Sequence, residues 1–332
     1  MNFTLIICTY QRPEPIIRLL NSVKKQKLYP NQILVIDGSL DNKTQEILQI
    51  NPFRNLEYYQ VDDNSRGLTK QRNFGIQKVN KASEIVCFLD DDTILRPFYF
   101  ENLLATYIKF PNALGVGGYI IGGVKWEMAD NQKQVSINHF CYDGYCRKDG
   151  SRFVLRKKMR LDADKPPAYF PDFGHGRSVS FLPPSGKIYP VEQLMGGVSS
   201  FKKTILEITK FSEYFEGYGL YEDADFTLRL SKRGKLYVNT AAQLEHHHET
   251  SGRPNQYKYG KMVVRNGWYV WRVKFPNPSL KARVKWNVTS LLLTLIRLSN
   301  SVTSTSKKEA FTEACGRIVG WWSLLLNPPR IQ

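Results

Sequence analysis

Three consecutive carboxylates, Asp90, Asp91 and Asp92, follow the apolar run of residues 85–89. The apolar residues predict a short strand buried on both faces, with the acids at its C-terminal end. In open α/β sheets this end of the strands is where ligands bind. Adjacent carboxylates repel one another, and a divalent cation held by oxygen ligands would neutralise them. We therefore expect a cation-dependent site here.

Polar side chains also follow the three earlier predicted strands. They are Thr9 and Arg12 after residues 3–8, Asp37 after residues 32–36, and Asp62 and Asp63 after residues 56–61. A single aspartate after a strand is often only a helix N-cap. Four such strand ends in succession predict a pocket, in which some acids hydrogen-bond a base or ribose and others hold a metal.

Helical patterns separate these strands. The β-α-β-α-β-α-β order over the first ninety or so residues predicts a largely parallel sheet with helices on both faces. A helix over 98–110 and a strand over 114–120 follow. Residues from about 125 to 190 show no clear pattern, and such a long excursion in a compact domain is usually functional or mobile. Regular structure is expected again from residue 194, with a helix that begins near Glu222 and a strand near 236–238.

Five segments in this order resemble the motifs of family 2 glycosyltransferases of the GT-A fold. They are CTYQR at 8–12, VIDGS at 35–39, KQRN at 70–73, FLDDD at 88–92 and YEDADF at 221–226. The resemblance covers roughly residues 1–250 and implies a Rossmann-like, mostly parallel central sheet with helices on both faces. It implies a catalytic domain over 1–252, with a nucleotide-sugar half to about 120 and an acceptor half from 121. A basic, Trp-rich helical extension would occupy 253–332.

The resemblance also implies roles for individual residues. The nucleotide-sugar pocket would comprise Thr9, Tyr10, Arg12, Asp37, Lys70, Arg72, Asp90 and Asp91. Asp92, with Asp90, would hold Mn²⁺ or Mg²⁺ on the diphosphate, since hard cations prefer oxygen ligands.

The triplet at residues 246–248 supplies three of the five histidines. In an extended chain His246 and His248 share one face. The family often has a histidine ligand here, which favours His248 and then His246, although the triplet leaves the register open. A solvent-exposed polar patch is the plainer alternative.

Glu222 and Asp223 lie at a predicted helix start, where the helix dipole favours acids in any protein. The resemblance implies that Asp223 is the general base of an inverting transfer and that Glu222 orients the acceptor. Gly196 and Gly197 would let the backbone approach the sugar, or would serve tight strand packing.

The formal net charge of +17 is compatible with nucleic acid, an anionic membrane surface or phosphate-bearing small molecules as partners. The tail combines cations with tryptophans, which is typical of helices at a membrane interface, although helices packed on the core would look alike. The apolar run 291–296 is too short to span a bilayer. The five cysteines suggest reduced thiols, and the N-terminus resembles a first strand and not a signal peptide. We expect a cytoplasmic protein, peripheral at the inner face of the membrane.

The combined expectation is a metal-dependent inverting glycosyltransferase. It would use a UDP-sugar first, or a dTDP-sugar second, and a hydroxyl of a lipid-linked or polysaccharide acceptor in a bacterial surface-polysaccharide pathway. Two alternatives remain. A nucleotidyltransferase acting on sugar phosphates would need a glycine-rich phosphate loop after the first strand, and residues 8–12 do not form one. A nucleic-acid-binding protein would need basic residues interleaved with aromatics on a recognisable module. We therefore expect no nucleic-acid partner. The sequence does not indicate an oligomeric state.

Overall fold

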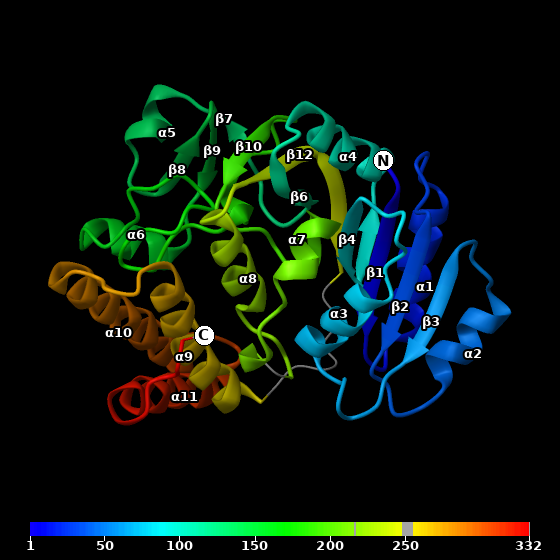
Figure 1. Ribbon diagram of the computed structural model, residues 1–332. Coiled ribbons are helices and arrows are strands. Elements are labelled where there is room, and N and C mark those ends of the chain that lie inside the picture. Colours follow the sequence, from blue (N-terminus) through cyan, green and yellow to red (C-terminus); the bar gives the residue numbers. More distant parts are fainter. Residues whose placement is uncertain (216, 248–254, 332) are drawn as a thin grey trace. The chain divides into compact units, whose positions relative to one another are not determined.

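The computed structural model describes residues 1–215, 217–247 and 255–331. The chain divides into two compact units (Figure 1). Unit 1 comprises Met1–Gly123 and Pro184–Gly252, and unit 2 comprises Val124–Pro183 and Arg253–Gln332. This division differs from the expected boundary at 252, because residues 124–183 group with the C-terminal segment.

Unit 1 is built on one nine-stranded sheet in the order β10-β12-β6-β11-β4-β1-β2-β3, with β5 paired to β12. The strands β1 to β4 are Phe3–Thr9, Gln32–Asp37, Leu56–Gln60 and Ile85–Asp90, and they are parallel to one another. The remaining strands are β5 (Thr93–Leu95), β6 (Ala113–Ile121), β10 (Ile188–Val191), β11 (Val198–Lys202) and β12 (Lys235–His246). Strand β11 inserts antiparallel between β4 and β6, whereas β12 runs parallel to β6.

Helices cover both faces of this sheet. The unit contains α1 (Pro13–Lys24), α2 (Lys43–Ile50), α3 (Leu68–Gln77), α4 (Tyr99–Lys109), α7 (Lys203–Ile208) and α8 (Glu222–Ser231), with a 3-10 turn, η2, at Glu213–Phe215. Alternate residues of β1 show why: Leu5 and Ile7 join the core beneath α1 and α4, whereas Ile6 faces Gly75 of α3. Both sides of the central strands are therefore apolar, as in buried parallel sheets. The predicted α/β fold with helices on both faces is confirmed.

Unit 2 contains a small sheet of β7 (Glu127–Met128), β9 (Tyr145–Lys148) and β8 (His139–Tyr142), the helices α5 (Asn131–Val135) and α6 (Ser151–Lys158), and a 3-10 turn, η1, at Val179–Phe181. The long helices α9 (Gln256–Lys274), α10 (Leu280–Thr303) and α11 (Lys307–Leu326) follow. The sequence pattern did not reveal the elements of residues 125–190, because their strands are too short to show periodicity. The helical character of the C-terminal segment agrees with the expectation.

One chemical expectation for unit 2 was wrong. Cys141 and Cys146 face each other across the β8–β9 hairpin and form a disulfide, although reduced thiols were expected. The tryptophans of the tail were compatible with a membrane interface or with packing on the core, and Trp271 and Trp286 are buried and stacked at 5.3 Å between ring centroids. Their burial makes them the core of the helical segment and leaves Trp322 exposed. No helix among the described residues is long and apolar enough to cross a membrane.

Candidate active site

The carboxyl ends of β1, β2 and β4 meet at one edge of the sheet. The register pairs Cys8 with Asp90 and Thr9 with Asp37, so the predicted strand-end groups come together. Asp91 is buried there and accepts hydrogen bonds from Thr9 Oγ1 at 2.6 Å and from Arg12 Nη1 at 3.0 Å. Burial raises the pKa of Asp91 to about 6, while Arg12 counteracts this shift. Asp91 therefore fixes this edge of the sheet and has little freedom to contact a ligand.

A possible metal site lies beside it. Asp90, Asp92 and His246 each offer one ligand atom, and these atoms lie within 4.8 Å of one another. His246 Nε2 is 2.8 Å from Asp92 Oδ1 and 4.0 Å from Asp90 Oδ2. Two carboxylates and an imidazole are a suitable donor set for Mn²⁺ and an acceptable one for Mg²⁺, so these residues fit the implied cation.

The backbone of β12 explains why a residue so far along the chain reaches these acids. Strand β12 ends by pairing antiparallel with β5, which places His246 opposite Thr93. His247 N donates to the carbonyl of Asp92 at 2.9 Å, and the exposed His247 ring hydrogen-bonds to Glu245. His246 is thus the described histidine that lies with the acids. His248, the favoured ligand at the sequence level, lies outside the described residues.

Burial alone would lower the pKa of His246. The hydrogen bond to Asp92 and the charge of Asp90 overcome this effect, so the pKa is raised overall. The imidazole therefore offsets part of the mutual repulsion of the two carboxylates.

Arg72 and Glu222 connect α3 to α8 behind this cluster. Their side chains form a hydrogen-bonded ion pair, and Arg72 Nη2 also lies 3.8 Å from Asp90 Oδ1. Burial raises the pKa of Glu222, and Arg72 counteracts the rise. Glu222 Oε2 is buried and accepts no hydrogen bond from the part of the chain that the structure describes. Arg72 thus has two acidic neighbours, and one oxygen of Glu222 remains available.

Asp223 follows Glu222 in the first turn of α8. Its Oδ2 accepts a hydrogen bond from Gly196 N at 3.1 Å and its Oδ1 accepts one from Ala224 N at 2.7 Å. Burial raises the pKa of Asp223, while these two backbone donors counteract the rise. A raised pKa improves a carboxylate as a proton acceptor, which makes Asp223 suited to general-base chemistry.

Gly196 and Gly197 bring the backbone before β11 against the acids. A Cβ on Gly197 would lie 1.9 Å from Asp90 Cγ, and one on Gly196 would lie 2.4 Å from Glu222 Oε1. Of the two roles considered for this pair, the structure shows close packing of backbone, here against the side chains of Asp90 and Glu222. Only glycine permits this approach.

Asp37 lies at the end of β2 among hydrogen-bond donors of the protein itself. It is fully buried, and its carboxylate accepts hydrogen bonds from Ser39 N at 2.8 Å, from Ser39 Oγ at 2.5 Å and from Tyr58 OH at 2.9 Å. Its oxygens thus stabilise the loop after β2. Tyr10 is exposed at the same edge, and Lys70 lies in the first turn of α3.

The sequence analysis missed one residue that organises this edge. Gln71 is buried, and its Nε2 donates to the carbonyls of Thr9 at 3.0 Å and Ile36 at 2.8 Å. It therefore ties the ends of β1 and β2 together. Its position inside the KQRN segment was the available signal, but a neutral amide between two cations does not by itself indicate a binding role.

Comparison with known proteins agrees with this geometry. Residues 4–166 match the model of Glycosyl transferase family 2. This segment, just under half of the chain, is similar to that family. The matching segment runs from β1 to just beyond α6, and therefore includes the strand ends and the three adjacent aspartates of the site.

Two curated relatives are similar over the same kind of segment. The glucosyl-dolichyl phosphate glucuronosyltransferase of Haloferax volcanii is 25% identical over 126 residues, which are 36% of this chain and 39% of that protein. The O-antigen chain rhamnosyltransferase of Salmonella typhimurium is 28% identical over 118 residues, 36% of this chain and 37% of that protein. The chain thus matches well under half of each relative's length.

The likeness in fold is wider. A mannosyltransferase from Pyrobaculum calidifontis, solved with GDP-Man and Mn²⁺, matches with a TM-score of 0.54 over 99% of this chain and 88% of that one, at 13% identity. At this identity the likeness shows the GT-A fold alone.

Proposed function

We propose that this protein is a metal-dependent glycosyltransferase that moves a sugar from a nucleoside-diphosphate donor to an acceptor hydroxyl. The observation that carries the proposal is the cluster of Asp90, Asp92 and His246 at the carboxyl edge of a family 2 sheet. Ligands of open α/β sheets bind at this edge. The relatives' names, which all describe sugar transfer, support the same class of reaction.

Residues of the sheet edge would bind the donor. Asp90, Asp92 and His246 would hold Mn²⁺ or Mg²⁺, which when bound would neutralise the diphosphate of the leaving group. His248 stays a further candidate ligand. Tyr10 and Lys70 would contact the nucleotide, and Asp37 would do so only by sharing the oxygens that Ser39 and Tyr58 already engage.

Thr9, Arg12 and Asp91 would support the donor site by positioning the residues that bind the donor and the metal. Their mutual hydrogen bonds hold the end of β1 against the turn after β4, and so position Asp90 and Asp92. Arg72 would steady Asp90 from the other side and contribute positive charge near the diphosphate.

Asp223 would act as general base. Its carboxylate would take the proton of the acceptor hydroxyl as that oxygen forms a bond to the anomeric carbon and the bond to the nucleoside diphosphate breaks. One displacement of this kind inverts the anomeric configuration. Glu222, whose Oε2 accepts no hydrogen bond from the described residues, would orient the acceptor.

The finer identity of both substrates is also a proposal. UDP is the first choice of nucleotide and dTDP the second, because an aspartate that contacts the base imide does not separate uracil from thymine. A lipid-linked or polysaccharide acceptor is supported by the relatives' names, one of which acts on a dolichyl phosphate sugar and the other on an O-antigen chain. An enzyme of this kind would work at the inner face of the cell membrane.

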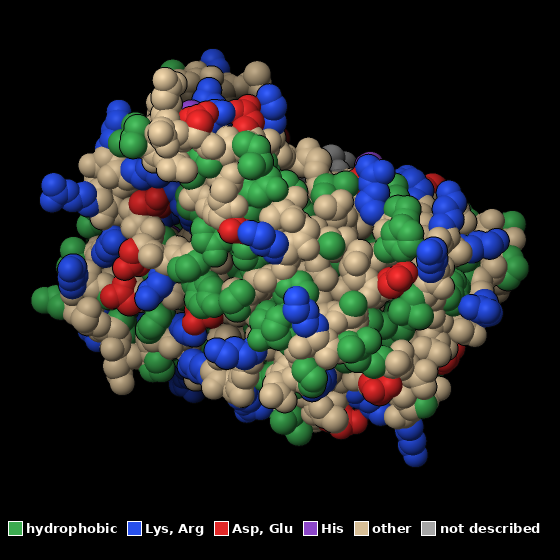
Figure 2. All heavy atoms as spheres, turned by 90° about the horizontal axis from the view of Figure 1, so that it is seen from above, with side chains coloured by type: hydrophobic (Ala, Val, Ile, Leu, Met, Phe, Trp, Pro, Cys, Tyr) green, Lys and Arg blue, Asp and Glu red, His purple; other side chains and the backbone are tan. Residues whose placement is uncertain are grey.

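The face in Figure 2 bears on the nucleic-acid alternative. Over the described residues of this face, Lys and Arg side chains are dispersed among neutral and apolar ones and are not gathered into a continuous track. Nucleic-acid-binding domains concentrate their positive charge on one face or along one helix. The basic composition therefore does not favour nucleic acid on this side.

A donor screen tests the proposed function. Release of nucleoside diphosphate would be measured for UDP-, dTDP- and GDP-sugars with a mixed glycolipid acceptor extract, with and without Mn²⁺. We expect release from one donor class that requires the metal. No release from any donor, together with no thermal shift by any of the three nucleotides plus Mn²⁺, would overturn the proposal.

A further inference from the structure

Helix α10 exposes a continuous apolar stripe along one side. Its exposed aliphatic residues are Leu280, Val284, Val288, Leu291, Leu295 and Val302. At about 100° of rotation per residue, all six fall within an arc of roughly 80°. The opposite side of the same helix, with Ala282 and Trp286, is buried in the core of unit 2. Helix α10 is thus apolar on two sides, and only one of them is explained by the fold.

Helix α11 carries a second stripe. Its exposed members are Phe311, Ile318, Val319, Trp322, Leu325 and Leu326. They fall within an arc of roughly 120° by the same rotation. Side chains on α11 outside this arc contact the neighbouring helices: Glu313 pairs with Arg297 of α10, and Trp321 Nε1 donates to Asn287 at 2.9 Å.

The two stripes lie on the same side of the helix pair. Residues 304–306 connect α10 to α11, and so short a connection makes packed helices antiparallel. On each helix the centre of the stripe lies roughly 100° to 140° from the mean direction of the residues that contact the other helix, and in the same rotational sense along the chain. Because reversing the direction of one helix also reverses its sense of rotation in space, both stripes point to one side. We call this surface the α10–α11 face.

Positive charge borders the α10–α11 face. Helix α10 contains Lys281, Arg283, Lys285 and Arg297 and no acidic residue. On the N-terminal turns of α10, Lys281 and Arg283 lie on opposite sides of the stripe and both are exposed. Lys307 and Lys308 are exposed at the start of α11. Lysine and arginine at the edge of an apolar face can bury their methylene stems and keep the charge in water.

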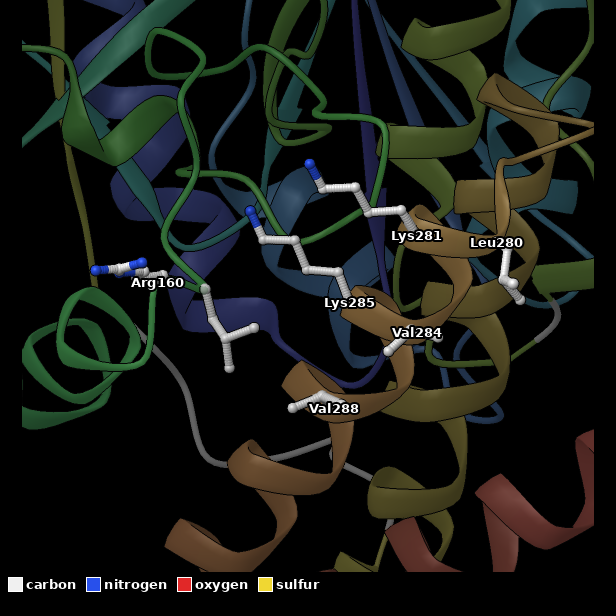
Figure 3. A pocket seen from close by; sticks show the side chains of 7 residues that line it. Arg160, Leu280, Lys281, Val284, Lys285 and Val288 are labelled. Atoms are coloured by element: carbon white, nitrogen blue, oxygen red, sulfur yellow. The ribbon is translucent and has the colours of Figure 1, made fainter.

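A hollow opens at the N-terminal end of the stripe. Its volume is about 500 Å³, and α10 lines it with Leu280, Val284 and Val288. Figure 3 shows Lys281 and Lys285 extending in the same direction from α10, while Arg160 approaches from another segment of unit 2. Aliphatic walls beside three cationic side chains suit an anionic headgroup whose chain continues along the stripe.

We propose that the α10–α11 face docks on an anionic phospholipid bilayer, with α10 lying in the plane of the interface. A bilayer accounts for the features together. The stripe is too wide and long for a small ligand, since residues 280–302 span about 33 Å of helix. Cationic edges match anionic headgroups, and the aromatic Trp322 suits the interfacial region. Because no described helix can span a membrane, the contact is a surface contact.

The inference deepens the proposed function, and rests on it only for its purpose, which is to bring the enzyme to a lipid-linked acceptor. The physical claim concerns unit 2 alone. Vesicle binding needs neither donor nor metal, so its failure and the failure of sugar transfer are separate results.

The test is co-sedimentation of the full chain with vesicles of mixed phosphatidylglycerol and phosphatidylcholine, and with vesicles of phosphatidylcholine alone. We expect binding to the mixed vesicles that weakens as salt is raised, because salt screens the cationic edges. Leu291→Gln/Leu295→Gln should weaken binding by at least about ten-fold, since two aliphatic side chains no longer enter the interface. Lys281→Gln/Lys308→Gln should weaken binding to mixed vesicles only.

Matched controls lie on unit 1. Ile108 and Ile208 are equally exposed aliphatic residues, and Ile108→Gln/Ile208→Gln should leave vesicle binding unchanged. Lys43→Gln serves the same purpose for charge. Circular dichroism would verify that every variant is folded.

Three outcomes would overturn the proposal. The first is that the wild type binds neither kind of vesicle. The second is that Leu291→Gln/Leu295→Gln and Ile108→Gln/Ile208→Gln lose vesicle binding to the same extent. The third is a concentration-dependent dimer that Leu291→Gln/Leu295→Gln abolishes while vesicle binding persists. The last would assign the face to a second copy of the chain, and sedimentation velocity measures it directly.

Discussion

Arg72 of α3 and Glu222 of α8 form an ion pair in which only 3% and 4% of the side chains are exposed. The guanidinium also lies 5.2 Å from the ring centroid of Phe211 and 3.8 Å from Asp90 Oδ1. The pair therefore links α3 and α8, which are far apart in the sequence, and it also lies beside Asp90, one of the proposed metal ligands. Its disruption should affect both folding stability and ligand binding, and the two effects can be separated.

Glu222→Gln should lower the free energy of unfolding by about 3 kcal/mol, because Arg72 would remain buried with only the more distant and more exposed Asp90 as counter-charge. Urea denaturation followed by circular dichroism measures this change. Glu207→Gln removes an exposed carboxylate from α7 and should change stability by less than about 0.5 kcal/mol. Equal stability of the Glu222→Gln variant and the wild type would contradict the role of the pair.

The paired substitution Arg72→Met/Glu222→Leu should recover most of that stability, since replacing a buried ion pair by apolar side chains of similar size is often neutral. The same variant should nevertheless bind UDP and Mn²⁺ weakly, because Asp90 loses its cationic neighbour. Isothermal titration calorimetry measures this loss. Nucleotide affinity that recovers together with stability would remove Arg72 from the proposed donor site.

Asp92→Asn should reduce the affinity for Mn²⁺ and for nucleotide in the presence of Mn²⁺ by at least about ten-fold. The amide keeps the shape of the side chain but offers the cation one neutral oxygen. Mn²⁺ binding followed by electron paramagnetic resonance gives a readout that does not depend on activity. The exposed Asp164→Asn is the matched control, and an unchanged Mn²⁺ affinity of Asp92→Asn would contradict the assignment.

The parallel half of the sheet and the order of the strand-end acids could be predicted from the sequence. The apolar runs before Asp37 and Asp90 are bounded by turn residues, and parallel strands place their carboxyl ends at one edge. The start of α8 at Glu222 could be predicted as well, because acids gather in its first turn. Local pattern was sufficient in each case.

What could not be predicted depended on contacts between distant segments. The sequence left open which histidine of the triplet meets the acids, because this depends on the pairing of His246 with Thr93, some 150 residues earlier. The tryptophans of the tail appeared interfacial from composition, but composition does not say which side of a helix is buried. The grouping of residues 124–183 with the tail likewise depends on tertiary packing.

Asp223→Asn should lower kcat by about 10² to 10⁴ and leave nucleotide and Mn²⁺ binding nearly intact. Because burial raises the pKa of Asp223, the wild-type rate should fall on acidification at a pH above the usual range for aspartate. Below that pKa the carboxyl carries a proton and cannot accept one from the acceptor. A pH–kcat profile measures the acidic limb.

Glu222 is the neighbouring carboxyl whose titration could be confused with that of Asp223, because burial raises its pKa as well. Glu222→Gln should keep the acidic limb if Asp223 is the base. Loss of the limb in Glu222→Gln, or loss of nucleotide binding in Asp223→Asn, would move the general-base role away from Asp223.

Gly197→Ala tests whether close backbone approach sets the position of Asp90. The added Cβ would lie 1.9 Å from Asp90 Cγ, so either this carboxylate or the segment before β11 must shift. We expect a folded protein with at least about ten-fold weaker Mn²⁺-dependent nucleotide binding, because a displaced ligand is comparable to a missing one. Gly123→Ala is the control, since nothing lies within 4 Å of a Cβ at that position. Undiminished binding in Gly197→Ala would show that the carboxylate can move without cost, and that the β11 backbone does not fix the metal site.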